Sequence, residues 1–312
     1  MPFSVASMQR IEFLAFDTVV SVAASTADAA TLGNCRDICV DLEHMLSRFE
    51  HSGPLCKLNH ACGAVTELPD ELAAFLQTAL RYCADSKGCF DITMGAVCRL
   101  WDFHQGIVPD KATVEDALCH VDYRGLHIEG SSAWLDDEQA CVDLGGIAKG
   151  YIADCLAQYL RSCGVVSALI NLGGNILTVG AKPDGCPWRI GIRAPHSSCY
   201  GDEKPFAVIE VCDKSVVTSG TYERAFEKDG VSYHHILDRA TGFPVQTDLL
   251  SATVVSDRSV DGDGYSTTLL VLGSKEALRF AQAHPQIEAA LLTHDGKLLV
   301  TDGFPKVSLL AF

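Results

Sequence analysis

The hydrophobic positions along the chain follow two spacings, one typical of strands and the other of helices. Residues 11–23 are rich in β-branched and aromatic side chains and predict an opening strand. In two later segments apolar residues recur every three or four positions, which predicts amphipathic helices over residues 28–49 and 70–86. A polar loop that contains Gly and Pro is expected between them, over residues 50–66.

The stretch 141–174 has the most regular pattern. A short strand at 141–144 leads through a pair of glycines into a helix over 147–163, for which Gly164 is a natural C-cap. A strand over 165–172 then ends in a second pair of glycines.

The rest of the chain mixes hairpins with one long helix. Its predicted elements are strands at 188–193, 206–211, 231–237, 251–256, 287–293 and 297–301 and a helix at about 260–283. Asp295-Gly296 is typical of a hairpin turn. This order predicts an α+β fold with mixed or antiparallel sheets and flanking helices. We expect a single domain over residues 1–312, with room for two closely packed lobes.

The composition is that of a globular protein with a full core, because 48% of the 312 residues are hydrophobic and 21% are charged. The 24 basic and 40 acidic residues give a net charge of −16. This balance argues against binding nucleic acid or a membrane surface through a basic face. An anionic ligand would need a metal ion or a local cluster of donors. No apolar run approaches the roughly 20 residues of a membrane span.

Cysteine usage points to a reducing compartment. The fourteen cysteines are scattered without a CxxC pair, and several, such as Cys35, Cys39 and Cys155, occupy apolar helical positions. We therefore expect reduced, mostly buried thiols in a cytoplasmic protein, and the N-terminus lacks the pattern of a signal peptide. A zinc site would need ligands whose spacing fits no standard finger, namely His51, Cys56, His60 and Cys62.

Two glycine turns are candidate ligand sites. In DLGGIAKG (143–150) a glycine turn feeds a helix N-terminus, where free backbone amides favour an anion and Lys149 could reach a phosphate. A tight connection with an exposed lysine explains the same residues equally well. In NLGGN (171–175) the glycines permit close backbone approach by a ligand, although a plain turn is the commoner explanation.

Two further clusters carry titratable groups. TSGTYER (218–224) is followed by YHHILD (233–238) and TGFP (241–244), and the two histidines of a strand would point to opposite faces. A histidine suits acid–base work, but a lone one is more often structural. In DGDGYSTT (261–268), Asp263 and Thr267 are four residues apart and offer the hard oxygen donors of a Mg²⁺ site. Asp263 could instead be a helix N-cap.

Together these segments resemble the FAD:protein FMN transferase family, the ApbE-like flavin transferases. The resemblance runs from about Phe16 to Gly273 and also includes FDITMG (90–95), which LWDF (100–103) follows. It implies an ApbE-like architecture related to the T-fold. It also implies transfer of FMN from FAD to a Thr or Ser hydroxyl of an acceptor redox flavoprotein, with Mg²⁺ (one or two ions) and release of AMP.

The resemblance also implies roles for individual residues. Asp263 and Thr267 would bind the metal, with the Gly146 carbonyl as a third ligand, and His235 would activate the acceptor hydroxyl. The expected FAD-binding residues are Thr18, Cys89, Phe90, Asp91, Thr93, Asp143, Lys149, Asn171, Gly173, Gly174, Ser219, Gly220, Thr221, Tyr222 and Ile236.

The sequence departs from the family pattern at three places. Asp17 stands where the opening motif usually has glycine, Gly264 replaces an alanine, and Arg239 follows Asp238 where proline is usual. Two other functions use the same residues: an FAD pyrophosphatase, in which water replaces the acceptor, and a non-catalytic flavin-binding protein. The acceptor is expected to be a separate protein, because the chain contains no segment of the D-x-x-T/S-G-A-T/S kind.

Overall fold

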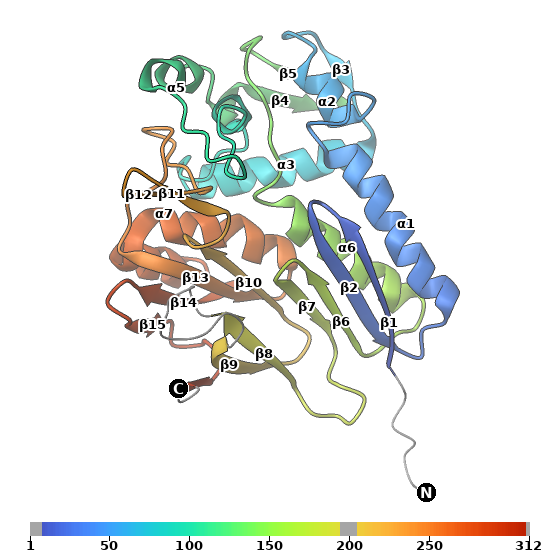
Figure 1. Cartoon of the computed structure of the whole chain (residues 1–312). Helices are drawn as coiled ribbons and strands as arrows, with labels where there is room; N and C mark the ends of the chain where they lie inside the picture. The colour runs from blue at the N-terminus through green and yellow to red at the C-terminus, as the bar shows by residue number, and fades with distance from the viewer. Residues whose placement is uncertain (1–7, 194–204, 310–312) are drawn as a thin grey trace, which may run out of the picture.

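An eight-stranded antiparallel sheet runs through the centre of the protein (Figure 1). The structure is a computed structural model that describes residues 8–193 and 205–309. In spatial order the strands are β1 (Met8–Ala15), β2 (Thr18–Ser25), β6 (Ala168–Leu172), β7 (Asn175–Val179), β10 (Ser215–Gly220), β13 (Leu249–Ser256), β14 (Ile287–Thr293) and β15 (Leu298–Val300).

Both faces of this sheet are covered. On one face lie α1 (Ala29–Leu46), α6 (Ala148–Ser162) and α7 (Ser259–Ala283); the other faces a small sheet of β8 (Trp188–Arg193), β9 (Pro205–Val211) and β16 (Val307–Leu309). Successive side chains of a central strand point to opposite faces of the sheet, so that they pack alternately in the two cores. In β14, Ala289 and Leu291 join the core under the helices, whereas Ala290 joins the core under the small sheet. This two-sided burial explains the nearly continuous apolar runs in the central strands.

The upper part of Figure 1 holds elements that come between the strands of the central sheet along the sequence. They are α2 (Pro54–Asn59), β3 (Thr66–Glu67), α3 (Asp70–Asp85), α4 (Gly95–Cys98), α5 (Lys111–Leu118), a 3₁₀ turn (Tyr123–Gly125), β4 (Leu126–Glu129), β5 (Ser132–Leu135), β11 (Ala225–Lys228) and β12 (Val231–His234). A third apolar cluster around Trp101 joins α4 and α5 to the β11–β12 hairpin. The expected helices at 28–49, 70–86 and 147–163 correspond to α1, α3 and α6.

The expected single strand at 11–23 is wrong: the segment forms the hairpin β1–β2. Ala15 pairs with Thr18, and the two residues between them, Phe16 and Asp17, have left-handed φ values of 55° and 53°. Two left-handed residues make a turn that matches strand twist, normally with Asn or Gly in these positions. Because neither residue here is Asn or Gly, the segment contains no clear local turn signal.

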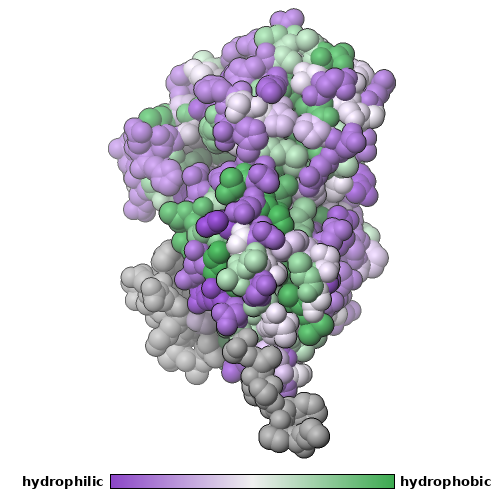
Figure 2. Space-filling model, turned by 90° about the vertical axis from the view of Figure 1, so that its right-hand side faces the viewer, coloured by the Kyte–Doolittle hydropathy of each residue, from purple (hydrophilic) through white to green (hydrophobic). Residues whose placement is uncertain are grey.

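The exposed face of this hairpin is partly apolar. Leu14 and Val19 are cross-strand partners and are 80% and 53% exposed. Figure 2, which views the molecule from the side of α1 and β1, shows apolar surface across the middle of this face, interspersed with polar surface.

The expected strand at 141–144 is also wrong. Its backbone is satisfied by a side chain: Asn59 donates to the Val142 carbonyl (2.9 Å) and accepts from the Val142 amide (2.8 Å). Cys141 makes only an isolated bridge to Met94. Asn59 lies in α2, which with β3 occupies part of the stretch expected to be a loop, 50–66.

Two other boundaries differ from expectation. The strand predicted at 231–237 ends at His234, because the chain turns back on itself and Leu237 pairs with Pro244. The long helix α7 consists of two helical segments that meet at Gly273, which has a φ of 72°. The predicted hairpin turn between β14 and β15 is confirmed, with Gly296 in the left-handed region.

Helices α6 and α7 are joined by two carboxylates, each of which binds backbone amides of the other helix. Asp154 in α6 accepts from the Ser259 amide (2.7 Å) and the Val260 amide (3.0 Å), at the start of α7. Asp263 in α7 accepts from the Gly150 amide (2.8 Å), in the first turn of α6. Neither helix has a side-chain N-cap of its own. Each carboxylate therefore satisfies amides that a helix start leaves without a partner.

This exchange requires close contact between the two helices. A Cβ atom on Gly150 would lie 2.5 Å from the Ser259 carbonyl oxygen and 2.8 Å from Cβ of Asp263. Glycine at this position therefore sets the distance between α6 and the start of α7.

Two expectations about the whole chain bear on the described residues. All 13 cysteines in the described ranges are free thiols, whereas Cys199 lies outside those ranges. The expectation that most are buried is wrong, because only Cys35, Cys39, Cys56 and Cys83 are buried. No helix within 8–193 or 205–309 has the length and apolar character needed to cross a membrane.

The carboxyl group of Asp154 should make the free energy of unfolding depend on pH. Desolvation raises the pKa of its carboxyl group to about 6, and the hydrogen bonds from the two α7 amides only partly oppose the shift. Because the folded state holds this proton more tightly than the unfolded state, the contribution of Asp154 to the free energy of unfolding falls as the pH rises from about 4 to about 6. The expected loss is on the order of 3 kcal/mol.

The measurement is urea unfolding of the wild type and Asp154→Asn at several pH values between 4 and 7. Since asparagine does not titrate, the wild type should lose stability relative to the variant as the pH rises through this window. Asp41→Asn, on the exposed side of α1, is the control. A wild-type advantage that grows with pH would contradict the assignment.

Candidate active site

The glycine loop before α6 is held by an ion pair that the sequence did not reveal. Asp143 accepts from the Gly145 amide (2.8 Å) and pairs with Nε of Arg48 (2.8 Å), which follows α1. Both side chains are largely buried. Gly145 and Gly146 remain exposed in front of the helix. No local signal marks Arg48, because its partner is distant in sequence.

The second glycine turn lies between β6 and β7, beside the tip of the β1–β2 hairpin. Gly173 and Gly174 have φ values of 60° and 100°, and the Asn171 side chain accepts from the Gly174 amide (2.8 Å). A Cβ atom on Gly173 would lie 2.2 Å from the hydroxyl oxygen of Thr18. The structure thus brings Thr18 together with Asn171 and the two glycines.

Hydroxyl groups connect the end of β10 to α7. The Ser219 hydroxyl lies 2.8 Å from that of Ser266 and 3.3 Å from that of Thr267. Gly220 packs under the ring of Tyr222, which a Cβ atom would approach to 2.8 Å. The Thr221 amide donates to the Leu250 carbonyl (3.0 Å). Ser219 is therefore the member of this segment in contact with one of the expected metal ligands, Thr267.

The positive charge of Lys149 acts on two carboxylates, those of Asp263 and Glu223. Desolvation raises the pKa of the buried Asp263, and the charge of Lys149 acts against that rise. Desolvation also raises the pKa of Glu223, against the charges of Arg193, Lys149 and Arg224. Glu223 is absent from the residues expected to form the site. The cluster of basic side chains around it supplies the local positive charge that an anion needs in a protein with a net charge of −16.

His235 is held in one tautomer. Its Nδ1 lies 2.8 Å from the backbone carbonyl oxygen of Glu223, and because a carbonyl can only accept, Nδ1 carries the proton. Nε2 then keeps its lone pair. Desolvation lowers the pKa of the ring to about 4, with help from the charges of Arg224 and Lys149 and against the hydrogen bond to Glu223. His235 is therefore a neutral proton acceptor at pH 7.

The segment 89–93 makes few contacts of the kind expected for a cofactor site. Phe90 packs close to Gly146, where a Cβ atom would lie 3.0 Å from its ring. Cys89 is half-buried, and desolvation raises the pKa of its thiol. Asp91 and Thr93 are buried and bind each other (2.6 Å).

Ile236, another expected cofactor residue, has its side chain in the main apolar core. The segment after His235 is thus anchored in the core.

The oxygen donors between α6 and α7 fit a hard cation. Asp263 is not a helix N-cap, because α7 begins at Ser259 and the Asp263 carboxylate binds α6. Within the described residues its Oδ2 is engaged by Gly150, and no hydrogen bond engages Oδ1. Thr267 lies about one turn further along α7. Carboxylate and hydroxyl oxygens suit Mg²⁺ better than zinc.

The candidate zinc ligands do not form a site. In the described part of the chain no three His, Cys, Asp or Glu side chains converge as a metal site would require. The ring of His60 instead contacts Cys56 of the same helical turn, with Nδ1 2.8 Å from the Cys56 carbonyl oxygen.

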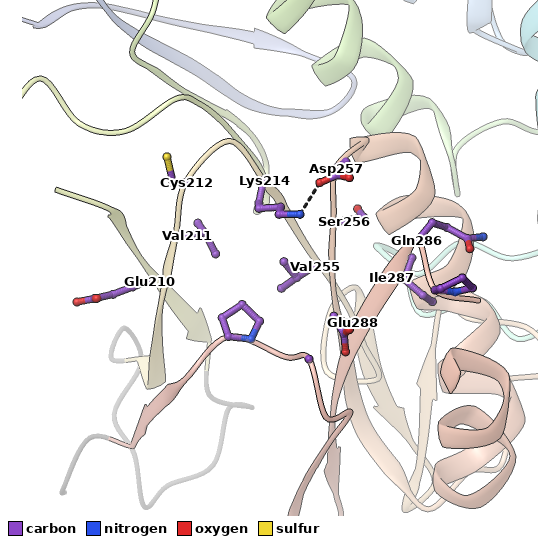
Figure 3. Close-up of a pocket in the computed structure, with 13 residues that line it drawn as sticks. Glu210, Val211, Cys212, Lys214, Val255, Ser256, Asp257, Gln286, Ile287 and Glu288 are labelled. Atoms are coloured by element: carbon purple, nitrogen blue, oxygen red, sulfur yellow. Dashed lines mark hydrogen bonds and ion pairs between the residues drawn. The ribbon is translucent and has the colours of Figure 1, made fainter. Parts of the chain in front are cut away.

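A cavity of about 360 Å³ lies at the other end of β10 and is lined by none of the expected site residues (Figure 3). Lys214 and Asp257 form an ion pair there, and Glu210 and Glu288 also line the cavity. The expected site residues lie elsewhere, at the two glycine turns, near the starts of α6 and α7, and at His235.

Comparison with proteins of known structure assigns the fold. A crystal structure of the ApbE protein from Thermotoga maritima superposes with a TM-score of 0.86 at 25% identity, covering 95% of this chain and 97% of that chain. The flavin transferase ApbE from Vibrio cholerae superposes with a TM-score of 0.85 at 26% identity, covering 96% and 99%. The protein is therefore of the ApbE structural class, and the predicted α+β architecture is confirmed.

Sequence comparison gives the family. The ApbE family pattern matches residues 16–291. The FAD:protein FMN transferase of Treponema pallidum is 36% identical over 279 residues, which are 84% of this chain and 76% of that protein. The enzyme of the same name from Klebsiella pneumoniae is 33% identical, over 83% of this chain and 81% of that protein. This chain belongs to the ApbE family.

The neutral, Nδ1-protonated state of His235 is open to direct measurement. We expect its imidazole nitrogens to stay in this state as the pH falls from 8 to about 5.5, because the ring titrates near pH 4 rather than near the ordinary 6.5. Long-range ¹H–¹⁵N spectra report the tautomer, and His235→Gln assigns the signals. A midpoint near 6.5 would contradict the expected lowering of the pKa, and a proton on Nε2 would show that His235 is not poised as a base.

Proposed function

We propose that this protein transfers FMN from FAD to a Thr or Ser hydroxyl of an acceptor protein, forming a phosphoester and releasing AMP. The observation that carries the proposal is His235, whose hydrogen bond to the Glu223 carbonyl leaves Nε2 free to accept a proton, within reach of the positive charges of Arg224 and Lys149. The printed names of relatives, FAD:protein FMN transferase, support the same reaction.

The diphosphate of FAD would bind at the start of α6. Exposed Gly145 and Gly146 allow close approach to backbone amides, and Lys149 adds a positive charge. The turn at Gly173 and Gly174, with Thr18 beside it, would contact the flavin part. These local donors offset the repulsion that an anion meets in an acidic protein.

We assign Mg²⁺ to the oxygen donors of Asp263 and Thr267, with the carbonyl of Gly146 as a third ligand; one or two ions would bind. Bound there, Mg²⁺ neutralises the charge of the diphosphate and of the leaving phosphate. The chain's own residues do the rest: α6 orients the diphosphate, and the Asp263 carboxylate stays fixed by its bond to Gly150.

The proton step falls to His235. As the acceptor oxygen bonds to the phosphorus of the FMN moiety, its proton passes to Nε2 of His235. The anhydride bond breaks, and its electron pair leaves with AMP. A positioned base of this kind contributes about 10²- to 10⁴-fold to the rate. The carbonyl of Glu223 holds the ring and stabilises the positive charge that develops on it.

The acceptor is proposed to be a separate redox flavoprotein that meets this chain in the cytoplasm, where the 13 described thiols would stay reduced. We also propose that the whole chain works as one domain, because the site residues span Thr18 to Thr267.

Mass spectrometry tests the reaction. The protein, FAD and Mg²⁺ are incubated with a candidate acceptor flavoprotein, and we expect a mass gain of FMN on a Thr or Ser, with one AMP released per modified chain. Free FMN and AMP with an unmodified acceptor would replace the proposal by FAD pyrophosphatase activity. FAD that binds without turnover, across a panel of acceptors, would indicate a flavin-binding protein.

Asp263→Asn tests the metal assignment. The amide keeps the size of the side chain but loses the charge, so we expect turnover at fixed Mg²⁺ to fall by at least about 100-fold, with partial recovery at high Mg²⁺. Asp261→Asn is a matched control one half-turn away, because its carboxylate accepts from Tyr82 on α3 (2.5 Å) rather than facing α6. Equal losses in the two variants would assign Asp263 to stability alone.

A further inference from the structure

His235 lies at the start of a closed loop. The Val245 amide donates to the Ile236 carbonyl (3.0 Å), and the Asp238 amide donates to the Phe243 carbonyl (2.8 Å). These bonds make residues 236–245 a compact turn rather than a free loop. Any displacement of the turn would therefore be transmitted to His235.

Two side-chain contacts fix the turn to the upper part of the molecule. Nε1 of Trp101 donates to the Gly242 carbonyl (3.1 Å). The second contact is made by Arg239, whose Nε donates to Oδ2 of Asp91 (2.9 Å) and whose Nη2 donates to the Val121 carbonyl (2.9 Å). Arg239 thus links the turn to two segments far away in the sequence.

The carboxylate of Asp91, which pairs with Arg239, is buried, and both of its oxygens accept hydrogen bonds from other groups of the protein. The side chain of Asp91 is 0% exposed. Its Oδ1 accepts from the amide (2.8 Å) and the hydroxyl (2.6 Å) of Thr93, and its Oδ2 accepts from the Tyr123 amide (3.2 Å) and from Arg239. With two donors on each oxygen, Asp91 retains no free direction toward a ligand.

A buried carboxylate needs its counter-charge. Arg239 supplies the only cation within hydrogen-bonding distance of Asp91 among the described residues. Removing one member of such a pair leaves an uncompensated charge in the interior, whereas removing both is far less damaging. The geometry of the turn therefore depends on the pair as a unit.

From this geometry we infer that Arg239 is a positioning residue for His235, and that Asp91 serves as the counter-ion of Arg239 and not as a ligand of FAD. The inference rests on the proposed function, because it takes His235 to be the base of that reaction. It also explains the departure of this chain from the Asp-Pro of the family pattern: proline fixes a turn by its ring, whereas here an ion pair anchors it.

The test compares four proteins: wild type, Arg239→Met, Asp91→Asn and the double variant. Arg239→Met should lower kcat for FAD turnover by about tenfold or more while KM for FAD changes by less than about threefold. The double variant should recover most of the lost kcat, because the buried charge is gone. Arg124→Met is the control, since Arg124 is exposed and pairs with Asp122 in the same region.

A second readout does not depend on turnover. In long-range ¹H–¹⁵N spectra the Nδ1-protonated tautomer of His235 should be lost or averaged in Arg239→Met, retained in Arg239→Lys and restored in the double variant. If the wild type turns over no FAD, the proposed function fails, but these spectra still decide the role of Arg239. Unchanged His235 signals and kcat in Arg239→Met would overturn the inference. So would a tenfold rise in KM for FAD in Asp91→Asn at unchanged kcat.

Discussion

The exchange of carboxylates between α6 and α7 is the interaction on which the rest of the site depends. Each helix begins without a side-chain cap of its own, and each receives one from its neighbour, through Asp154 and Asp263. Orphan amides at a buried helix start would cost on the order of 1–3 kcal/mol each. The exchange removes that cost and fixes the distance between the helices. It also leaves Asp263 buried beside the first turn of α6, where a diphosphate would meet the helix dipole and a cation together.

A protein with a net charge of −16 can bind an anion only where positive side chains are gathered locally. Two motif aspartates, Asp143 and Asp91, have arginine partners from distant segments, Arg48 and Arg239. These pairs fix the glycine loop before α6 and the turn after His235. The charge of Lys149, which has no such partner among the described residues, acts on both Asp263 and Glu223. Asp143 and Asp91 therefore hold the site in shape through their ion pairs, whereas Asp263 would bind the metal ion.

Much of the fold could be predicted because the pattern is local. The amphipathic periods of α1, α3 and α6 and the apolar runs of the central strands follow directly from the positions buried. The β1–β2 turn was not predicted because it lacks the usual glycine or asparagine. The other failures have one cause, a partner that the local sequence does not contain: the segment 141–144 looks like a strand but binds Asn59. Glu223, Arg48 and Arg239 were missed as site residues for the same reason, whereas Thr18, Asn171, Ser219 and Thr267 were predictable from the family motifs and are brought together in space in two groups.

The most direct test of this account is a crystal structure of the protein with FAD and Mn²⁺ in place of Mg²⁺, with anomalous data collected at the manganese edge. The account predicts an anomalous peak within bonding distance of Asp263 and Thr267, with the diphosphate at the start of α6 and Nε2 of His235 facing the phosphorus of the FMN moiety. A peak elsewhere, or a diphosphate bound away from α6 while Asp263 still binds Gly150, would contradict it.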